Sequence, residues 1–120
     1  MYTTNLNKKN IITLYDRFLH SEGLIFEPDL DTINYDKVIY LGYKDNEKYY
    51  KVTGTYTCMS AELTCVYEPQ GNDPISGSTY ELYSGIIVFE KNQEKDYYEL
   101  KYINSNDMGY EYTEVNEEVN

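Results

Sequence analysis

The chain has 120 residues, and its 21 acidic residues outnumber its 10 basic ones to give a formal net charge of −11. This length predicts one domain, residues 1–120, with a single modest core. The acidic excess excludes naked nucleic acid and an anionic membrane as direct ligands, because phosphate binding needs lysine and arginine. It favours a basic partner protein, or no partner.

The first predicted element is a helix over residues 5–22. Thr3, Thr4 or Asn5 is expected to cap its start. Apolar side chains recur at helical spacing and form one stripe, made of Ile11, Leu14, Tyr15, Phe18 and Leu19.

From residue 37 the apolar pattern changes to the alternation that is typical of β-strands. Strands are predicted at residues 37–43, 49–58, 63–67, 80–90, 97–103 and 110–115, with fraying after about residue 115. Residues 27–36 and 68–78 are predicted to be loops. Short connections allow hairpins but not parallel crossovers, so the fold class is α+β, an N-terminal helix packed on an antiparallel sheet of five or six strands.

The strand predicted at residues 80–90 is apolar on both faces at its centre. Ile86 and Val88 alternate there with Ile87 and Phe89. A strand with two apolar faces is buried on both sides. We therefore expect the helix on one face, and the long loop, the tail or a second subunit on the other.

Membrane and export signals do not appear in the sequence pattern. No segment approaches the roughly 18 consecutive apolar residues of a membrane helix, and the opening MYTTNLNKKN has no apolar signal core. Cys58 and Cys65 flank a predicted tight turn, which would make them neighbours across a hairpin. Such a pair is within reach of a disulfide, which is the alternative interpretation. Two cysteines do not form a disulfide framework, so we expect reduced thiols and a cytoplasmic protein.

No catalytic, metal or cofactor site is predicted. His20 is the only histidine, and no nucleophile or orienting acid is signalled beside it. Asp29, Asp31, Asn34 and Asp36 lie in one predicted loop, but that loop lacks the glycine turn and the terminal glutamate of a calcium site. We expect a protein that is not an enzyme and that uses no metal or cofactor.

Acidic residues dominate the end of the chain, where no lysine or arginine follows Lys101. Carboxylates there could stand in for phosphates, and tyrosines could supply contact area, against a basic partner protein. The alternative interpretation is that these acids only keep the protein soluble. The residues expected to contact a partner are Glu94, Asp96, Tyr110, Glu111, Tyr112, Glu114, Glu117 and Glu118.

The amino-acid usage is that of an AT-rich genome, with 16 tyrosines and a single arginine. In type, the chain resembles the small acidic proteins with which phages block bacterial defences, including DNA mimics and anti-CRISPR proteins. It also resembles immunity proteins that neutralise basic nuclease toxins. The resemblance implies an inhibitor of a nucleic-acid-binding enzyme, located in the host cytoplasm. The other hypothesis is a small-molecule-binding or sequestering protein, with tyrosines lining a cavity at the open end of a curved sheet.

Overall fold

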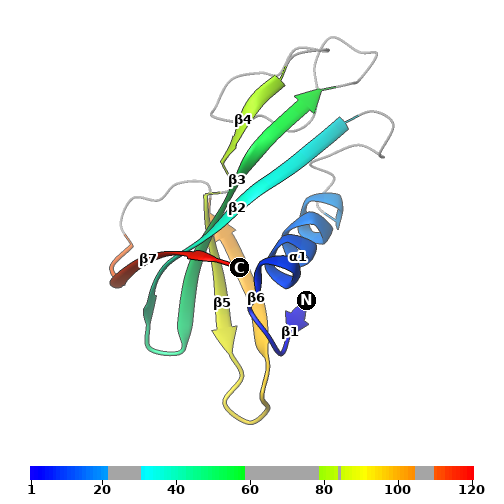
Figure 1. Cartoon of the computed structure of the whole chain (residues 1–120). Helices are drawn as coiled ribbons and strands as arrows, with labels where there is room; N and C mark the ends of the chain where they lie inside the picture. The colour runs from blue at the N-terminus through cyan, green and yellow to red at the C-terminus, as the bar shows by residue number, and fades with distance from the viewer. Residues whose placement is uncertain (22–30, 59–78, 84, 105–109) are drawn as a thin grey trace.

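The computed structural model describes residues 1–21, 31–58, 79–83, 85–104 and 110–120. These residues form one helix and one antiparallel sheet of seven strands (Figure 1). The α+β class and the antiparallel sheet predicted from the sequence are therefore confirmed. The elements are β1 (Tyr2–Thr3), α1 (Lys8–Ser21), β2 (Asp31–Lys44), β3 (Glu47–Cys58), β4 (Thr79–Tyr83), β5 (Ile86–Lys91), β6 (Tyr98–Asn104) and β7 (Thr113–Val119).

The spatial order of the strands is β1-β6-β5-β3-β2-β7, and β4 pairs with the second half of β3. β2 and β3 are the longest strands and form a hairpin that runs diagonally through the molecule (Figure 1). Their turn contains Asp45, whose φ of 54° is a left-handed conformation that aspartate tolerates better than most residues. β7 pairs with β2 on one side of this hairpin, β4 and β5 pair with β3 on the other, and β6 and then β1 extend the sheet beyond β5.

Three predictions about the strands need correction. β2 begins at Asp31, because Ile33 and Tyr35 favour extended chain and pair with the second half of β3, so the predicted loop over residues 27–36 ends earlier. The single strand predicted at residues 80–90 is two strands, β4 and β5, and Gly85 between them has a φ of 76° that interrupts the extended backbone. This break and the short β1 bring the described strands to seven rather than five or six. The last strand also lies later than predicted, since β7 continues to Val119.

α1 has the predicted apolar stripe, and its start is set by a different residue from those expected. The Oδ1 of Asn7 accepts a hydrogen bond of 2.8 Å from the backbone N–H of Asn10, so Asn7 is the cap. Thr3, the last residue of β1, and Asn5 both lie before Asn7, and both accept hydrogen bonds from the side-chain amide of Asn10. Four side chains of the stripe are buried: Ile11, Leu14, Tyr15 and Leu19.

Buried residues of β5 alternate between two clusters, as the two-sided apolar pattern predicts. Ile87 and Phe89 belong to the first core, together with Ile11, Leu14, Tyr15, Leu19, Val38, Tyr50 and Val52. Ile86 and Val88 belong to the second core, together with Leu41 and Tyr49. Residues next to each other in β5 project from opposite faces of the sheet, so the two cores lie on opposite faces.

An ion-pair network ties three strands together beside the second core. Glu47 of β3 lies directly opposite Glu90 of β5, an arrangement in which two like charges repel. The Nζ of Lys101, from β6, donates to both carboxylates, at 2.9 Å and 2.8 Å. This shared donor offsets the repulsion, and the two carboxylates hold the pKa of Lys101 above its ordinary value.

Some predictions lie outside the described residues. They are the pairing of Cys58 with Cys65, the strand at residues 63–67 and the loop at residues 68–78. In the part of the chain that the structure describes, no helix is long and apolar enough to cross a membrane.

Candidate protein-binding edge

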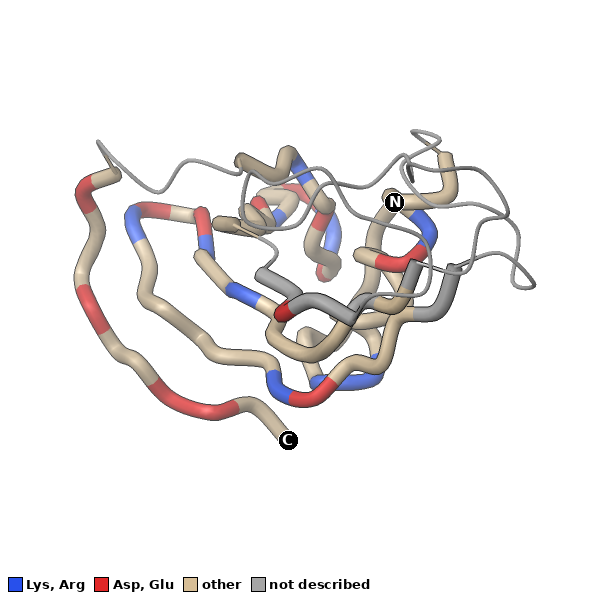
Figure 2. The backbone as a smooth tube through the Cα atoms, turned by 90° about the horizontal axis from the view of Figure 1, so that it is seen from above, with Lys and Arg blue, Asp and Glu red and all other residues tan. Residues whose placement is uncertain are grey.

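The acidic edge, which we define as Glu111, Glu114, Glu117 and Glu118, lies on β7 and just before it. β7 pairs antiparallel with β2 and ends the strand order of the sheet. Seen from above, this outer segment carries acidic residues and no basic ones (Figure 2). All four glutamates are exposed. The structure therefore brings the four predicted tail acids together on one edge strand and its approach.

Two tyrosines hold this segment against the second core. The ring of Tyr112 stacks on Tyr49 with 4.8 Å between ring centroids, and Tyr110 meets the same ring edge-on at 5.9 Å. The hydroxyl of Tyr110 also accepts a hydrogen bond of 2.9 Å from the side-chain amide of Asn104. Both tail tyrosines are half-buried, so most of their contact area serves the fold and only part of each ring faces outward.

A glycine in β2 makes room for the tail. A Cβ placed on Gly42 would overlap the carbonyl oxygen of Thr113 and would lie 2.5 Å from Cδ2 of Tyr112. Real Cβ atoms do not approach other atoms so closely, and only glycine allows the two backbones to come this near. Gly42 is thus the residue on which the position of the acidic edge depends most directly.

The glutamates of β7 project from both faces of the sheet. Glu117 lies opposite Tyr40, whose side chain packs on the first core, while Glu118 lies opposite Ile39, which packs on the second. Glu114 lies opposite Gly42. A partner that approaches the edge of the sheet therefore meets carboxylates above and below it.

Few basic groups neutralise these carboxylates. The Nζ of Lys37 lies 3.9 Å from Oε1 of Glu118, and both side chains are about half exposed. Among the described residues, no lysine or arginine lies within 4.0 Å of the other three carboxylates. Exposed pairs of this kind contribute little stability, so the edge keeps most of its negative field.

Burial and nearby carboxylates also disfavour ionised tyrosine beside the edge. Burial first, and then Glu47, raise the pKa of Tyr49 to about 12. Burial, the neighbouring Tyr43 and Tyr98, and the charge of Glu117 raise the pKa of Tyr40 above its ordinary value. Both shifts have the sign expected of phenols that are desolvated in a negative field.

The two remaining predicted acids lie elsewhere on the sheet. Glu94 and Asp96 are exposed in the turn between β5 and β6, where the side chain of Asn92 accepts hydrogen bonds of 2.9 Å from the N–H groups of Glu94 and Lys95. β5 is separated from β7 by β3 and β2 in the strand order. The predicted set of contact residues thus divides into an edge group and a turn group.

A histidine, an acid and a tyrosine meet on one side of α1, a grouping that was not predicted from the sequence. Asp16 accepts a hydrogen bond of 2.6 Å from the hydroxyl of Tyr35, and its other carboxylate oxygen lies 3.5 Å from Nε2 of His20. The spacing of Asp16 and His20, one helical turn, was the available signal. In the described chain no serine, threonine or cysteine side chain hydrogen bonds to His20, and no group of three His, Cys, Asp or Glu residues could hold a metal.

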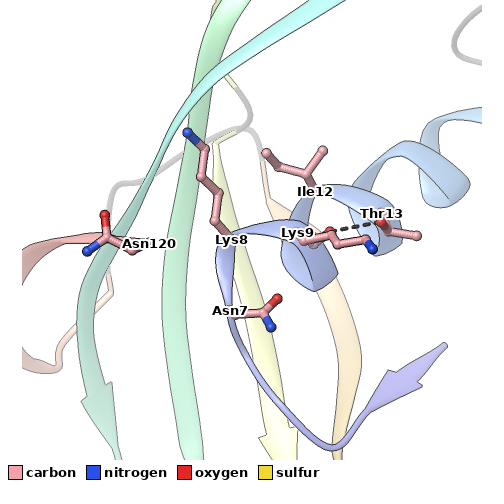
Figure 3. A pocket seen from close by; sticks show the side chains of 6 residues that line it. All are labelled: Asn7, Lys8, Lys9, Ile12, Thr13 and Asn120. Carbon is pink, nitrogen blue, oxygen red and sulfur yellow. Dashed lines mark hydrogen bonds between the residues drawn. The ribbon is translucent and has the colours of Figure 1, made fainter.

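An open hollow of about 550 Å³ lies where the end of the chain meets the start of α1 (Figure 3). The N–H of Lys8 donates to the backbone carbonyl of Asn120 at 3.2 Å beside it. The residues that line the hollow are Asn7, Lys8, Lys9, Ile12, Thr13 and Asn120. No tyrosine is among them, so the tyrosine-lined cavity considered from the sequence stays a prediction.

Comparison with known proteins gives no relative. No protein-family model, no curated protein and no solved structure matches this chain. The function is therefore inferred from the chemistry of the edge itself.

Proposed function

We propose that this protein is a non-enzymatic inhibitor that binds the basic surface of a nucleic-acid-binding protein through its acidic edge. The observation that supports this proposal most directly is the placement of four exposed glutamates at one end of the sheet, with one lysine within 4.0 Å of them in the described chain. Carboxylates on an extended strand can occupy a lysine- and arginine-lined site that normally holds phosphates. In this proposal the helix packs on one sheet face and meets the tail at Asn120, just after β7, through the backbone N–H of Lys8. The four glutamates stay exposed.

The proposed partner is a cytoplasmic enzyme that handles nucleic acid, such as a bacterial defence nuclease or a basic toxin. The net charge of −11 would attract such a protein over a distance and speed its association. In this proposal the inhibitor is of the phage anti-defence, DNA-mimic or immunity type. Nucleic acid itself is not a ligand, because like charges repel.

A simpler interpretation of the same acids is protection of the sheet. Exposed edge strands invite unwanted pairing, and natural proteins use charges and bulges to prevent it. β7 has both, since Asn116 has a φ of 55° and the register with β2 shifts beside it. Protection needs only that copies of the edge repel each other, whereas inhibition needs that a basic protein binds there.

Capture from a nuclease-treated host lysate separates these interpretations. The edge variant carries Glu111→Lys, Glu114→Lys and Glu117→Lys, and the matched control variant carries Asp36→Lys, Glu81→Lys and Glu99→Lys at exposed positions elsewhere. Both variants change the net charge by the same amount. The proposal predicts a basic protein that is captured by the wild type and the control at low salt, is lost at high salt, and is not captured by the edge variant. Equal capture by both variants would reject the proposal.

A further inference from the structure

We propose that the acidic edge binds by strand addition, in which an extended lysine- or arginine-rich segment of the partner pairs with the free backbone of β7. This inference rests on the proposed function and narrows it from a basic surface to a basic strand. Three observations support it: the open side of β7, the alternation of its side chains, and the charge of the other sheet edge.

The open side of β7 is a backbone template. β7 has seven residues, and in the described part of the chain its pairing is with β2 alone. A strand bonded on one side leaves every second N–H and C=O group pointing away from the sheet. Such a row accepts an added strand, a recurring way in which proteins bind extended peptides. Seven residues are enough for a pairing of ordinary length.

The side chains of β7 indicate which kind of strand would pair with it. Val119 lies opposite Val38 and packs on the first core, yet it stays half-buried, as does Val115 on the same face of the strand. Glu114 and Glu118 project from the other face, and Glu117 lies between the two valines on the first face. An added strand with apolar residues beside the valines would complete their cover, and its lysines would face the glutamates.

Charge selects both the partner and the edge. A second copy of β7 would place glutamates against glutamates, so the chain does not suit itself as the occupant. At the other end of the sheet, β1 covers only the start of β6, and the uncovered part of β6 carries Lys101. A basic strand is attracted to β7 and is less favoured at β6. The bulge at Asn116 requires the added strand to shift register, as β2 does.

Backbone methylation of a probe peptide tests this inference. The probe is the capped heptapeptide Lys-Val-Lys-Val-Lys-Val-Lys, compared with one version N-methylated at every lysine and another N-methylated at every valine. Successive N–H groups of a strand point to opposite sides, so each version blocks one side of the peptide while keeping its charge. In an antiparallel pairing, like every other pairing of this sheet, one version should lose affinity by about tenfold or more and the other should stay close to the unmodified peptide.

Two further comparisons keep the outcomes distinct. The peptide should bind the control variant (Asp36→Lys, Glu81→Lys, Glu99→Lys) as it binds the wild type, and its addition should slow amide exchange in β7 but not in β6. Equal effects of the two methylated versions, whether large or absent, would overturn strand addition. If binding then still depended on the edge glutamates, the proposed function would stand without it. Equal binding by the edge and control variants would instead reject the proposed function.

Discussion

The two faces of the sheet are completed by different parts of the chain. Among the residues that the structure describes, the first core contains nine buried side chains, four of which come from α1. The second core contains four such side chains, and the half-buried rings of Tyr110 and Tyr112 pack against it from the tail. One face is thus filled by a large contiguous cluster, and the other by a small cluster that depends on the segment carrying the acidic edge.

This difference separates two kinds of residue that lie side by side in the tail. The tyrosines contact Tyr49 and hold the segment in place, while the glutamates point into solvent. Changes to the tyrosines should therefore alter stability and the position of β7. Changes to the glutamates should alter binding and leave the fold intact.

Neighbouring isoleucines of β5 give the largest expected effect. Ile86 and Ile87 are 1 % and 0 % exposed but belong to different cores. Substitution of a buried isoleucine by alanine costs about 2–5 kcal/mol, and more where the surroundings cannot collapse into the cavity. We expect the loss of unfolding free energy, measured by urea unfolding, to lie near the upper end of this range for Ile87→Ala. For Ile86→Ala it should lie near the lower end. An equal or larger loss for Ile86→Ala would show that the second core is not the weaker one.

Gly42→Ala should displace the tail from the second core. The new methyl group overlaps the Thr113 carbonyl and the Tyr112 ring, and such overpacking costs about 1–3 kcal/mol. Amide exchange should speed up in β7 while it stays slow in β5. The double variant Gly42→Ala/Tyr112→Ala should lose less stability than the sum of the two single changes, because the Tyr112 ring that the new methyl group would overlap is absent. Strict additivity would contradict this account of the tail.

Asn116 should tolerate glycine but not valine. Its φ of 55° costs roughly 1–2 kcal/mol for most residues, and asparagine and glycine adopt it more easily. Thermal unfolding should show Asn116→Gly close to the wild type and Asn116→Val destabilised by about 1 kcal/mol. Equal stability of the two variants would mean that the bulge relaxes without cost.

High pH should loosen the second core through Tyr49. Its pKa of about 12 in the folded protein lies above the ordinary tyrosine value of 10.0, so the neutral phenol is favoured by folding. The resulting stability is fully present below pH 10 and is lost as the pH rises from about 10 to about 12. Tyr49→Phe should flatten this part of the stability curve. If the dependence of stability on pH were the same in Tyr49→Phe as in the wild type, Tyr49 would not be the source of this loss.

The parts of the fold that were predictable are those with local signals. The stripe from Ile11 to Leu19 predicts a helix at α1, and the alternation in β3 and β6 predicts strands, because each pattern repeats within a few residues. The start of β2 was missed because its polar residues favour a loop until β3 lies beside them. The break before β5 depends on the left-handed Gly85, whose φ no neighbouring residue determines.

The candidate site was predictable in composition but not in arrangement. The tail acids are visible in the sequence, but their grouping with Tyr110 and Tyr112 concealed two different roles. The contact between Tyr112 and Gly42 joins residues far apart in the chain, and the isolated glycine within a predicted strand was its only signal. Glu94 and Asp96 were grouped with the tail by charge alone, and sheet topology separates them.

The association rate of the captured basic partner tests the central claim most directly. It should be measured by stopped flow against rising salt for the wild type, the edge variant and the matched control variant, after thermal unfolding has shown that all three fold. Charge steering raises association rates by about tenfold or more at low salt and is screened as salt rises. We expect the edge variant to associate about tenfold more slowly than the control variant at low salt, and the two rates to converge at high salt. Equal rates for the two variants at every salt concentration would contradict it.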